Sequence, residues 1–299
     1  MSFEYRRLKD PAYFAENRLA AHSDHIVYAR MEELLRGESS LYCPLDGLWK
    51  FFCARNENQI IPGFEGSDYD CHPWADIPVP AHIQLEGYGA PQYVNQQYPW
   101  DGREEIRPGE IPEEHNPVGS YVTYFQVPEA MRGERVFLSF QGAESGLAVW
   151  LNGSYVGYGE DSFTPSEFEV TPYLSEGENK LAVQVFQFTA GSWCEDQDFF
   201  RFSGIFRDVF LYSVPRVHVY DLEVRPLLEE DLQTGLLTMN LALLEQVEGC
   251  ASLCLSLDGK PVAQLQASLP LAQKLELSIP SPALWSAEAP VLYDLEISV

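Results

Sequence analysis

Apolar side chains in the middle of the chain recur at every second position, which is the pattern of β-strands. Val136, Leu138 and Phe140 follow this spacing, and so do the apolar residues over 147–151. Successive side chains of a strand point to opposite faces, so each set lines one face. Residues 48–52 and 181–186 have the same character and predict two further strands.

Turn residues separate these runs. Asn152-Gly153 stands between two alternating segments and predicts a tight hairpin, because both turn residues must adopt positive φ. The stretch over 61–118 is rich in proline and glycine, so we expect long loops there. Short strands with turns about every ten residues indicate a β-sandwich.

The composition changes near Pro215, after which leucine replaces the aromatic residues. Asp258-Gly259 predicts a second hairpin turn there. Strands fit 218–225, 236–244, 251–257, 262–269 and 274–279. About 80 residues of short strands suit a small immunoglobulin-like sandwich.

Residues 1–40 lack the alternating pattern of the rest of the chain. Helix formers with spaced apolar residues over 11–21 and 26–35 predict one or two short helices. This segment has too little apolar surface to fold alone. It either packs on its own chain or reaches a neighbouring subunit.

Composition narrows the class of protein. The 299 residues are 45% hydrophobic and 21% charged, a globular balance, and 13% are aromatic. The net charge of −26 disfavours nucleic acids and anionic membranes. The six cysteines form no C-x-x-C pair, and we find neither a signal peptide nor a membrane span, so the sequence predicts a cytoplasmic protein. The six histidines are dispersed, which favours solvated or hydrogen-bonded roles over a metal site.

One run over 195–209 combines acids, arginines and phenylalanines, a mixture that suits a neutral sugar. Its sequence, EDQDFFRFSGIFRDV, resembles a segment of the β-galactosidases of glycoside hydrolase family 2. GYGAPQYVNQQYP over 87–99 resembles the same family. Weaker matches follow the family's order at 17–22, 116–121, 150–168 and 284–293.

The resemblance implies an all-β chain made of a jelly-roll, galactose-binding-like sandwich followed by an immunoglobulin-like sandwich. We therefore expect an N-terminal extension over 1–40, a jelly-roll sugar-binding domain over 41–216 and an immunoglobulin-like domain over 217–299. In the family a (β/α)₈ barrel comes next. It would need about 250 further residues.

The same resemblance assigns two substrate-binding residues. Asp198 matches an aspartate that contacts galactose and helps to bind sodium, and Asn95 matches an asparagine on a loop that reaches the sugar. From spacing alone, Asp198 would more often be a structural partner of Arg201 or Arg207, and Asn95 an ordinary turn residue. The family match reverses this preference for both residues.

No residue of this chain is assigned a catalytic role. Retaining glycosidases use two carboxyl groups about 5 Å apart, and the family carries both glutamates and its magnesium ligands on the barrel. Magnesium and sodium are thus expected in the complete enzyme, and neither is expected to bind this chain tightly. The expected partners are a β-galactoside, the barrel and, for the parent enzyme, further copies of itself.

The predicted function is the N-terminal part of a β-galactosidase that hydrolyses terminal β-D-galactosides with retention. This part would supply one wall of the galactose pocket, support the barrel and be inactive alone. One alternative is a stand-alone carbohydrate-binding module. Another is a different family 2 glycosidase, such as a β-glucuronidase.

Overall fold

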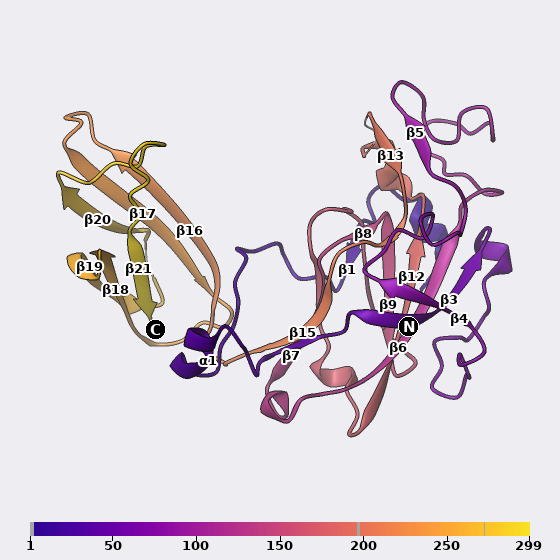
Figure 1. The fold of residues 1–299 in the computed structure, drawn as a ribbon, viewed down its shortest axis with the longest axis horizontal. Helices are drawn as coiled ribbons and strands as arrows, with labels where there is room; N and C mark the ends of the chain where they lie inside the picture. The colour runs from indigo at the N-terminus through magenta and orange to yellow at the C-terminus, as the bar shows by residue number, and fades with distance from the viewer. Residues whose placement is uncertain (1–2, 196–197, 272) are drawn as a thin grey trace. The chain divides into compact units, whose positions relative to one another are not determined.

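A computed structural model describes residues 3–195, 198–271 and 273–299. Asp196 and Gln197, in the run that carries the family resemblance, lie outside the described residues. The chain divides into two compact units. Unit 1 comprises Met1–Ala21 and Val27–Val214, and unit 2 comprises His22–Ile26 and Pro215–Val299. Strands supply nearly all the regular structure, which confirms the all-β prediction (Figure 1).

Unit 1 is a sandwich of two large sheets. The seven-stranded sheet has the order β1 (Ala15–Glu16), β10 (Ser154–Gly159), β9 (Gly146–Leu151), β12 (Glu178–Phe186), β6 (Val118–Gln126), β3 (Gly47–Ala54) and β4 (Ala75–Val79). The four-stranded sheet has the order β11 (Ser166–Glu169), β7 (Arg135–Phe140), β15 (Val209–Val214) and β2 (Tyr42–Pro44). The strands predicted from alternation are all present.

Two apolar clusters bury both faces of the larger sheet. On one face, alternate residues of β9 such as Val149 join Leu138 of β7 in the core between the sheets. On the other face, Trp150 packs with Phe3, Phe64 and other residues of the N-terminal segment and the loops. All six residues of β9 are buried as a result.

The Asn152-Gly153 hairpin forms as predicted between β9 and β10. Asn152 has φ 52° and Gly153 has φ 79°, the left-handed values that such a turn requires. Asn152 is also held from outside the turn, because its side-chain amide donates to the carbonyl of Tyr173 at 2.9 Å.

The N-terminal segment is less helical than its composition suggests. The segment over 11–21 forms turns, bends and the short strand β1, in which Ala15–Glu16 pairs with β10, so the helix predicted there is wrong. Pairing with an open sheet edge outweighs the weak helix propensity of these residues. Short helices do form at η1 (Tyr5–Lys9) and α1 (Met31–Arg36), and α1 ends at Gly37 with φ 70°.

The proline-rich stretch contains two strands that the sequence did not reveal, β4 and β5 (Gln92–Val94). β5 pairs with β13 (Phe199–Arg201) in a two-stranded sheet, here called the β5–β13 ladder. Figure 1 shows this ladder at one end of the sandwich. A second small sheet joins β8 (Ala143–Glu144) to β14 (Gly204–Ile205). Short 3₁₀ turns lie at Glu57–Gln59, Glu129–Met131, Thr171–Tyr173 and Ala190–Trp193.

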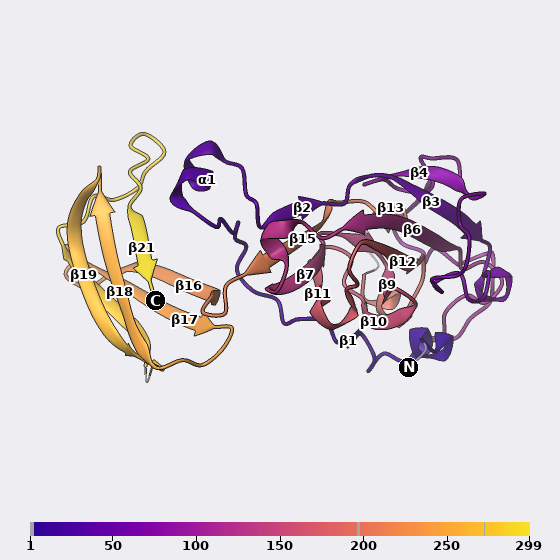
Figure 2. The ribbon, with the colours of Figure 1, turned by 90° about the horizontal axis from the view of Figure 1, so that it is seen from below.

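Unit 2 is a smaller sandwich of two three-stranded sheets (Figure 2). One contains β16 (Val219–Leu228), β17 (Thr234–Leu243) and β20 (Leu275–Pro280). The other contains β19 (Lys260–Leu269), β18 (Gly249–Leu257) and β21 (Asp294–Ser298). Their inner residues form one core. Residues 22–26 attach to this unit, where the Ser23 N–H donates to the Asp221 carboxylate at 2.8 Å.

Candidate functional site

The β5–β13 ladder brings the two predicted sugar-binding residues to the same place. Val94 pairs with Phe199, and Tyr93 pairs with Phe200. Asn95 directly follows β5 and Asp198 directly precedes β13, so extending this antiparallel register by one residue sets them opposite each other. Both residues are exposed. Two segments far apart in sequence therefore present an amide and a carboxylate side by side.

The carboxylate of Asp198 is held by a tyrosine. The hydroxyl of Tyr93 donates a hydrogen bond to Asp198 Oδ1, and this bond raises the pKa of Tyr93. Arg207 instead donates to the backbone carbonyls of Phe163 at 2.9 Å and Gln141 at 3.3 Å. The Asp198 carboxylate thus keeps acceptor positions that face solvent.

Four aromatic rings around Asp198 are unusually open to solvent. Tyr93, Phe163, Phe199 and Phe200 are 44–54% exposed. Phe163 meets Phe199 edge-on at 6.2 Å, and Tyr93 lies 5.4 Å from Phe200 between ring centroids. Exposed rings beside a carboxylate and an amide offer flat apolar surface together with hydrogen-bonding groups, which is what a sugar ring requires.

Aromatic stacking holds the loop after Asn95. The rings of Tyr98 and Trp100 are nearly parallel at 5.1 Å, and Trp193 lies within 4.8 Å of both. Gln92 Nε2 also donates to the carbonyl of Pro99 at 2.9 Å. These contacts fasten the loop to the 3₁₀ turn that precedes the Asp198 segment.

Polar groups, several of them buried, hold the segment around Asp198 on the side of the sandwich core. The N–H and hydroxyl of Ser162 donate to the two carboxylate oxygens of Glu195 at 2.9 and 3.0 Å. Arg201, which is buried, donates to the Glu195 carbonyl at 2.8 Å. Glu160 accepts hydrogen bonds from Thr189 and Gly191, and burial raises its pKa. The exposed ladder is therefore held at its base by a hydrogen-bonded polar layer.

Three histidines that are distant in sequence meet in unit 2. The His25 ring lies 5.2 Å from that of His22 and 4.8 Å from that of His218. Burial, followed by the neighbouring imidazoles, lowers the pKa of His218 to about 4. These three histidines, which the sequence analysis treated as dispersed, therefore lie together in the folded chain. Among the described residues, however, no group of three or more His, Cys, Asp or Glu side chains is arranged to hold a metal ion.

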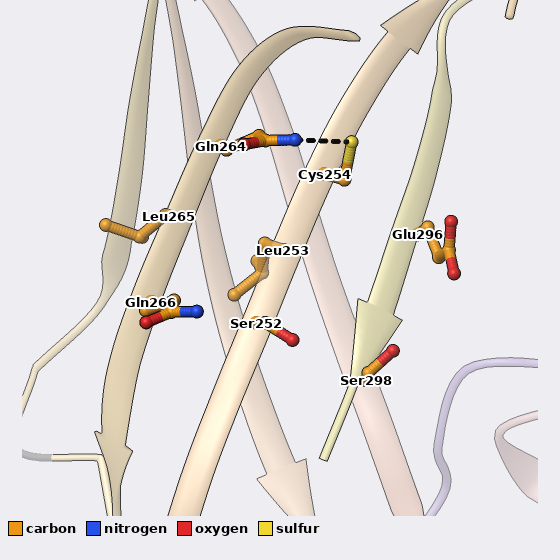
Figure 3. A pocket seen from close by; sticks show the side chains of 8 residues that line it. All are labelled: Ser252, Leu253, Cys254, Gln264, Leu265, Gln266, Glu296 and Ser298. Carbon is orange, nitrogen blue, oxygen red and sulfur yellow. Dashed lines mark hydrogen bonds between the residues drawn. The ribbon is translucent and has the colours of Figure 1, made fainter.

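Unit 2 carries two other depressions. One lies on the outer face of β18, β19 and β21, with a volume of about 250 Å³, and its lining includes Ser252, Gln266 and Glu296 (Figure 3). The other is an apolar groove of about 430 Å³ that includes the exposed residues Leu284, Trp285 and Leu292. Neither combines an amide, a carboxylate and aromatic rings, so the β5–β13 ladder is the better candidate for a sugar site.

Sequence reasoning did not identify Tyr93, although it lies two residues before Asn95 in the motif over 87–99. It also missed the anchoring roles of Glu195 and Ser162. The two-residue spacing of Tyr93 and Asn95 was an available signal. No local signal linked Ser162 to Glu195, because their contact depends on the folded arrangement of loops.

No helix in the described part of the chain has the length and apolar character needed to cross a membrane. Models of two protein-family domains match most of the chain. Residues 43–215 match the glycosyl hydrolases family 2 sugar binding domain, and residues 217–299 match glycosyl hydrolases family 2.

Curated relatives agree with these matches. The chain is similar to a β-galactosidase of Halalkalibacterium halodurans, with 52% identity over 293 residues that cover 96% of this chain. A β-galactosidase of Streptococcus thermophilus is 44% identical over 98% of this chain. The chain spans 29% of the length of each relative.

The fold also resembles solved structures. A β-glucuronidase from Ruminococcus gnavus, in complex with uronic isofagomine, matches with a TM-score of 0.62 and 19% identity. The match covers 86% of this chain and 41% of that one. At this identity the likeness concerns the fold alone.

Proposed function

This chain belongs to glycosyl hydrolase family 2, and we propose that it forms one wall of the galactose pocket of a longer β-galactosidase. The observation that supports this most directly is the placement of Asn95 opposite Asp198 among exposed aromatic rings. The 52% identity to a β-galactosidase supports the choice of sugar. The proposed parent hydrolyses terminal β-D-galactosides with retention, and its two catalytic glutamates lie outside this chain.

The two residues divide the recognition of the sugar. The Asp198 carboxylate accepts hydrogen bonds from sugar hydroxyls, and the Asn95 amide both donates and accepts. Tyr93 keeps the carboxylate in place. The exposed rings of Phe199 and Phe200 remain available to the C–H face of the sugar or to the domain that completes the pocket.

The same carboxylate is suited to sodium. A hard cation prefers oxygen ligands, and Asp198 offers an exposed carboxylate oxygen. Asp198 is a single ligand, so we propose that the remaining ligands of the sodium site, and all magnesium ligands, come from the rest of the enzyme. Both ions would then depend on the complete protein.

A β-glucuronidase function is the less favoured enzyme reading. Its substrate carries a carboxylate, which the Asp198 carboxylate would repel at close range. The solved β-glucuronidase relatives share only 18–22% identity with this chain. Comparing the hydrolysis of an aryl β-galactoside with that of the matching β-glucuronide by the complete protein separates the two readings.

We also propose that the rest of the enzyme and further copies of it cover apolar surface on this chain. Met31, Leu34 and Leu35 on α1 are 50–81% exposed, and the apolar groove of unit 2 adds a second surface. Patches of this kind commonly mark interfaces. We expect the 299-residue chain alone to have no hydrolytic activity.

The test is substitution at the ladder in the complete protein. Asp198→Ala should raise KM for an aryl β-galactoside by about 10- to 100-fold, because a charge-assisted hydrogen bond contributes about 1.5–3 kcal/mol. Asp208→Ala is the matched control, since Asp208 is an exposed aspartate in the same run. An unchanged KM for Asp198→Ala would contradict the proposal.

The carbohydrate-binding module is tested on the chain alone. Half a pocket offers few contacts, so titration with galactose should show no binding tighter than the millimolar range. Tighter binding that Asp198→Ala abolishes would favour an independent module over a pocket wall.

A further inference from the structure

Glu144 is a buried acid beneath the β5–β13 ladder. It lies in β8 and pairs with Gly204 of β14, which follows β13 after two residues. Its side chain is almost fully enclosed, with a relative exposure of 7%. Buried acids normally have a hydrogen-bonding partner, so the surroundings of Glu144 call for an explanation.

A small polar cavity adjoins this side chain. It is lined by Glu144, Ser192, Glu195 and Arg201, among others, and its volume of about 10 Å³ leaves room for about one water molecule. Among the described residues, the side chains that act on the Glu144 carboxyl group are the charged groups of Glu195 and Arg201. The geometry therefore points to contact through the cavity with the groups that line it.

Two charged side chains, Glu195 and Arg201, influence the pKa of Glu144. Burial raises its pKa most, the Glu195 carboxylate raises it further, and the Arg201 guanidinium lowers it, which leaves a pKa of about 8. Glu160, on the segment after β10, faces Glu195 in turn. The remaining lining residues are not ionisable, namely Pro99, Ser145, Gln187, Phe188, Ser192 and Phe202. At neutral pH the Glu144 carboxyl group is thus mostly uncharged and can both donate and accept.

The two charged neighbours bracket the sugar-binding aspartate. Glu195 precedes Asp198 by three residues and Arg201 follows it by three. Arg201 donates to the Glu195 carbonyl, and the Glu195 carboxylate is tied to Ser162. Hydrogen bonds therefore hold both charged residues at positions that flank Asp198.

We propose that Glu144 is a positioning residue for Asp198, and that its carboxyl group holds the base of the β5–β13 ladder through the cavity it shares with Glu195 and Arg201. This inference rests on the proposed function, because it assumes that Asp198 binds the sugar. Glu144 touches neither the sugar nor the reacting atoms.

Ionisation of Glu144 breaks this arrangement. Loss of its proton places two carboxylates across a cavity with room for one water molecule, where repulsion is strong. The ladder base then shifts, and only the fraction of molecules with uncharged Glu144 binds sugar well. For a midpoint of about pH 8, that fraction falls to about one tenth at pH 9, so the apparent affinity falls about tenfold.

The experiment measures KM and kcat of the complete protein for an aryl β-galactoside from about pH 6 to about pH 10. We expect KM of the wild type to rise about tenfold between pH 7 and pH 9. Glu144→Gln keeps the size and an uncharged polar group, so its KM should stay nearly constant over this range. Glu169→Gln is the matched control, because Glu169 lies on β11, forms an ion pair with Arg135 of β7 and should retain the wild-type profile.

A second measurement needs no variant. The backbone amide resonances of Phe199 and Phe200 in the wild-type chain should shift with a common midpoint near pH 8 in NMR spectra, as expected for a coupled titration. A KM rise that persists in Glu144→Gln, or the absence of this midpoint, would overturn the inference. If Asp198→Ala also leaves KM unchanged at every pH, the proposed function fails. If Asp198→Ala weakens binding while Glu144→Gln keeps the wild-type profile, only the role of Glu144 fails.

Discussion

Strands β9 and β18 are both central strands of their sheets, yet their burial differs completely. Every residue of β9 in unit 1 is buried, whereas β18 in unit 2 alternates between buried and more accessible residues. The second face of β9 is covered by the N-terminal segment and long loops. The outer face of β18 carries Ser252 and Cys254 beside the polar residues of β19 and β21 (Figure 3).

The comparison shows how the two sandwiches differ in the coverage of a central sheet. Covering the second face of a sheet requires long, ordered loops, and loops positioned by a rigid scaffold are where binding residues commonly lie. The β5–β13 ladder is built from such loops. Unit 2 has one core, and the outer face of β18 remains polar, as expected for an antiparallel sheet with one solvated side.

The largest expected effect on stability comes from removing a side chain that covers the second face of β9. Trp150→Ala should lower the free energy of unfolding of unit 1 by about 3–5 kcal/mol, because it removes a large ring from a packed cluster. Gln266→Ala, on the outer face of unit 2, should change stability by less than about 0.5 kcal/mol. Calorimetric unfolding of both variants measures the difference. Equal effects would show that the coverage of β9 adds little stability.

The two units also differ in how a cationic side chain is used, because Lys180 of unit 1 is buried and Arg216 of unit 2 is exposed. Lys180 on β12 donates to the carbonyls of Phe64, Gly66 and Tyr69 at 2.7–2.9 Å, and so ties the covering loop to the sheet. Lys180→Met leaves these carbonyls without their donor and should cost about 2–3 kcal/mol. The exposed pair of Arg216 and Glu245 in unit 2 is the contrast, and Arg216→Ala should cost less than about 0.5 kcal/mol. A negligible loss for Lys180→Met in chemical denaturation would refute the anchoring role.

The smallest effect concerns the pH dependence of unit 2. The folded-state pKa of His218 lies at about 4, below the unfolded value of about 6.5. The unfolded state therefore binds more protons between these values, so stability is complete above about pH 6.5 and falls as the pH approaches 4. Since His218 is only half-buried, the loss should be on the order of 1 kcal/mol.

His218→Gln removes this proton binding. Thermal unfolding of the variant between pH 6.5 and pH 4 should show a weaker loss of unit 2 stability than the wild type. An identical pH dependence in both proteins would assign the effect to other groups. Unit 1 should show no change with this substitution.

Much of the fold could be predicted because its signals are local. The Asn152-Gly153 turn and the alternation over 136–151 depend on neighbouring residues only. The helix predicted over 11–21 was wrong because an open edge of β10 decides the conformation of Ala15–Glu16. Strands β4 and β5 were missed because proline and glycine suppress the alternation that would reveal them.

The sequence by itself determined the strands with clear alternation, the positions of two tight turns and, through two specific motifs, the family and the candidates Asn95 and Asp198. Only the tertiary structure decided that these two residues lie opposite each other, that Glu144 is buried beneath them, and that His22 and His25 meet His218. The reason is physical. Alternation and turn chemistry act between near neighbours, whereas long-range pairing and the burial of an acid depend on how the whole chain closes around them.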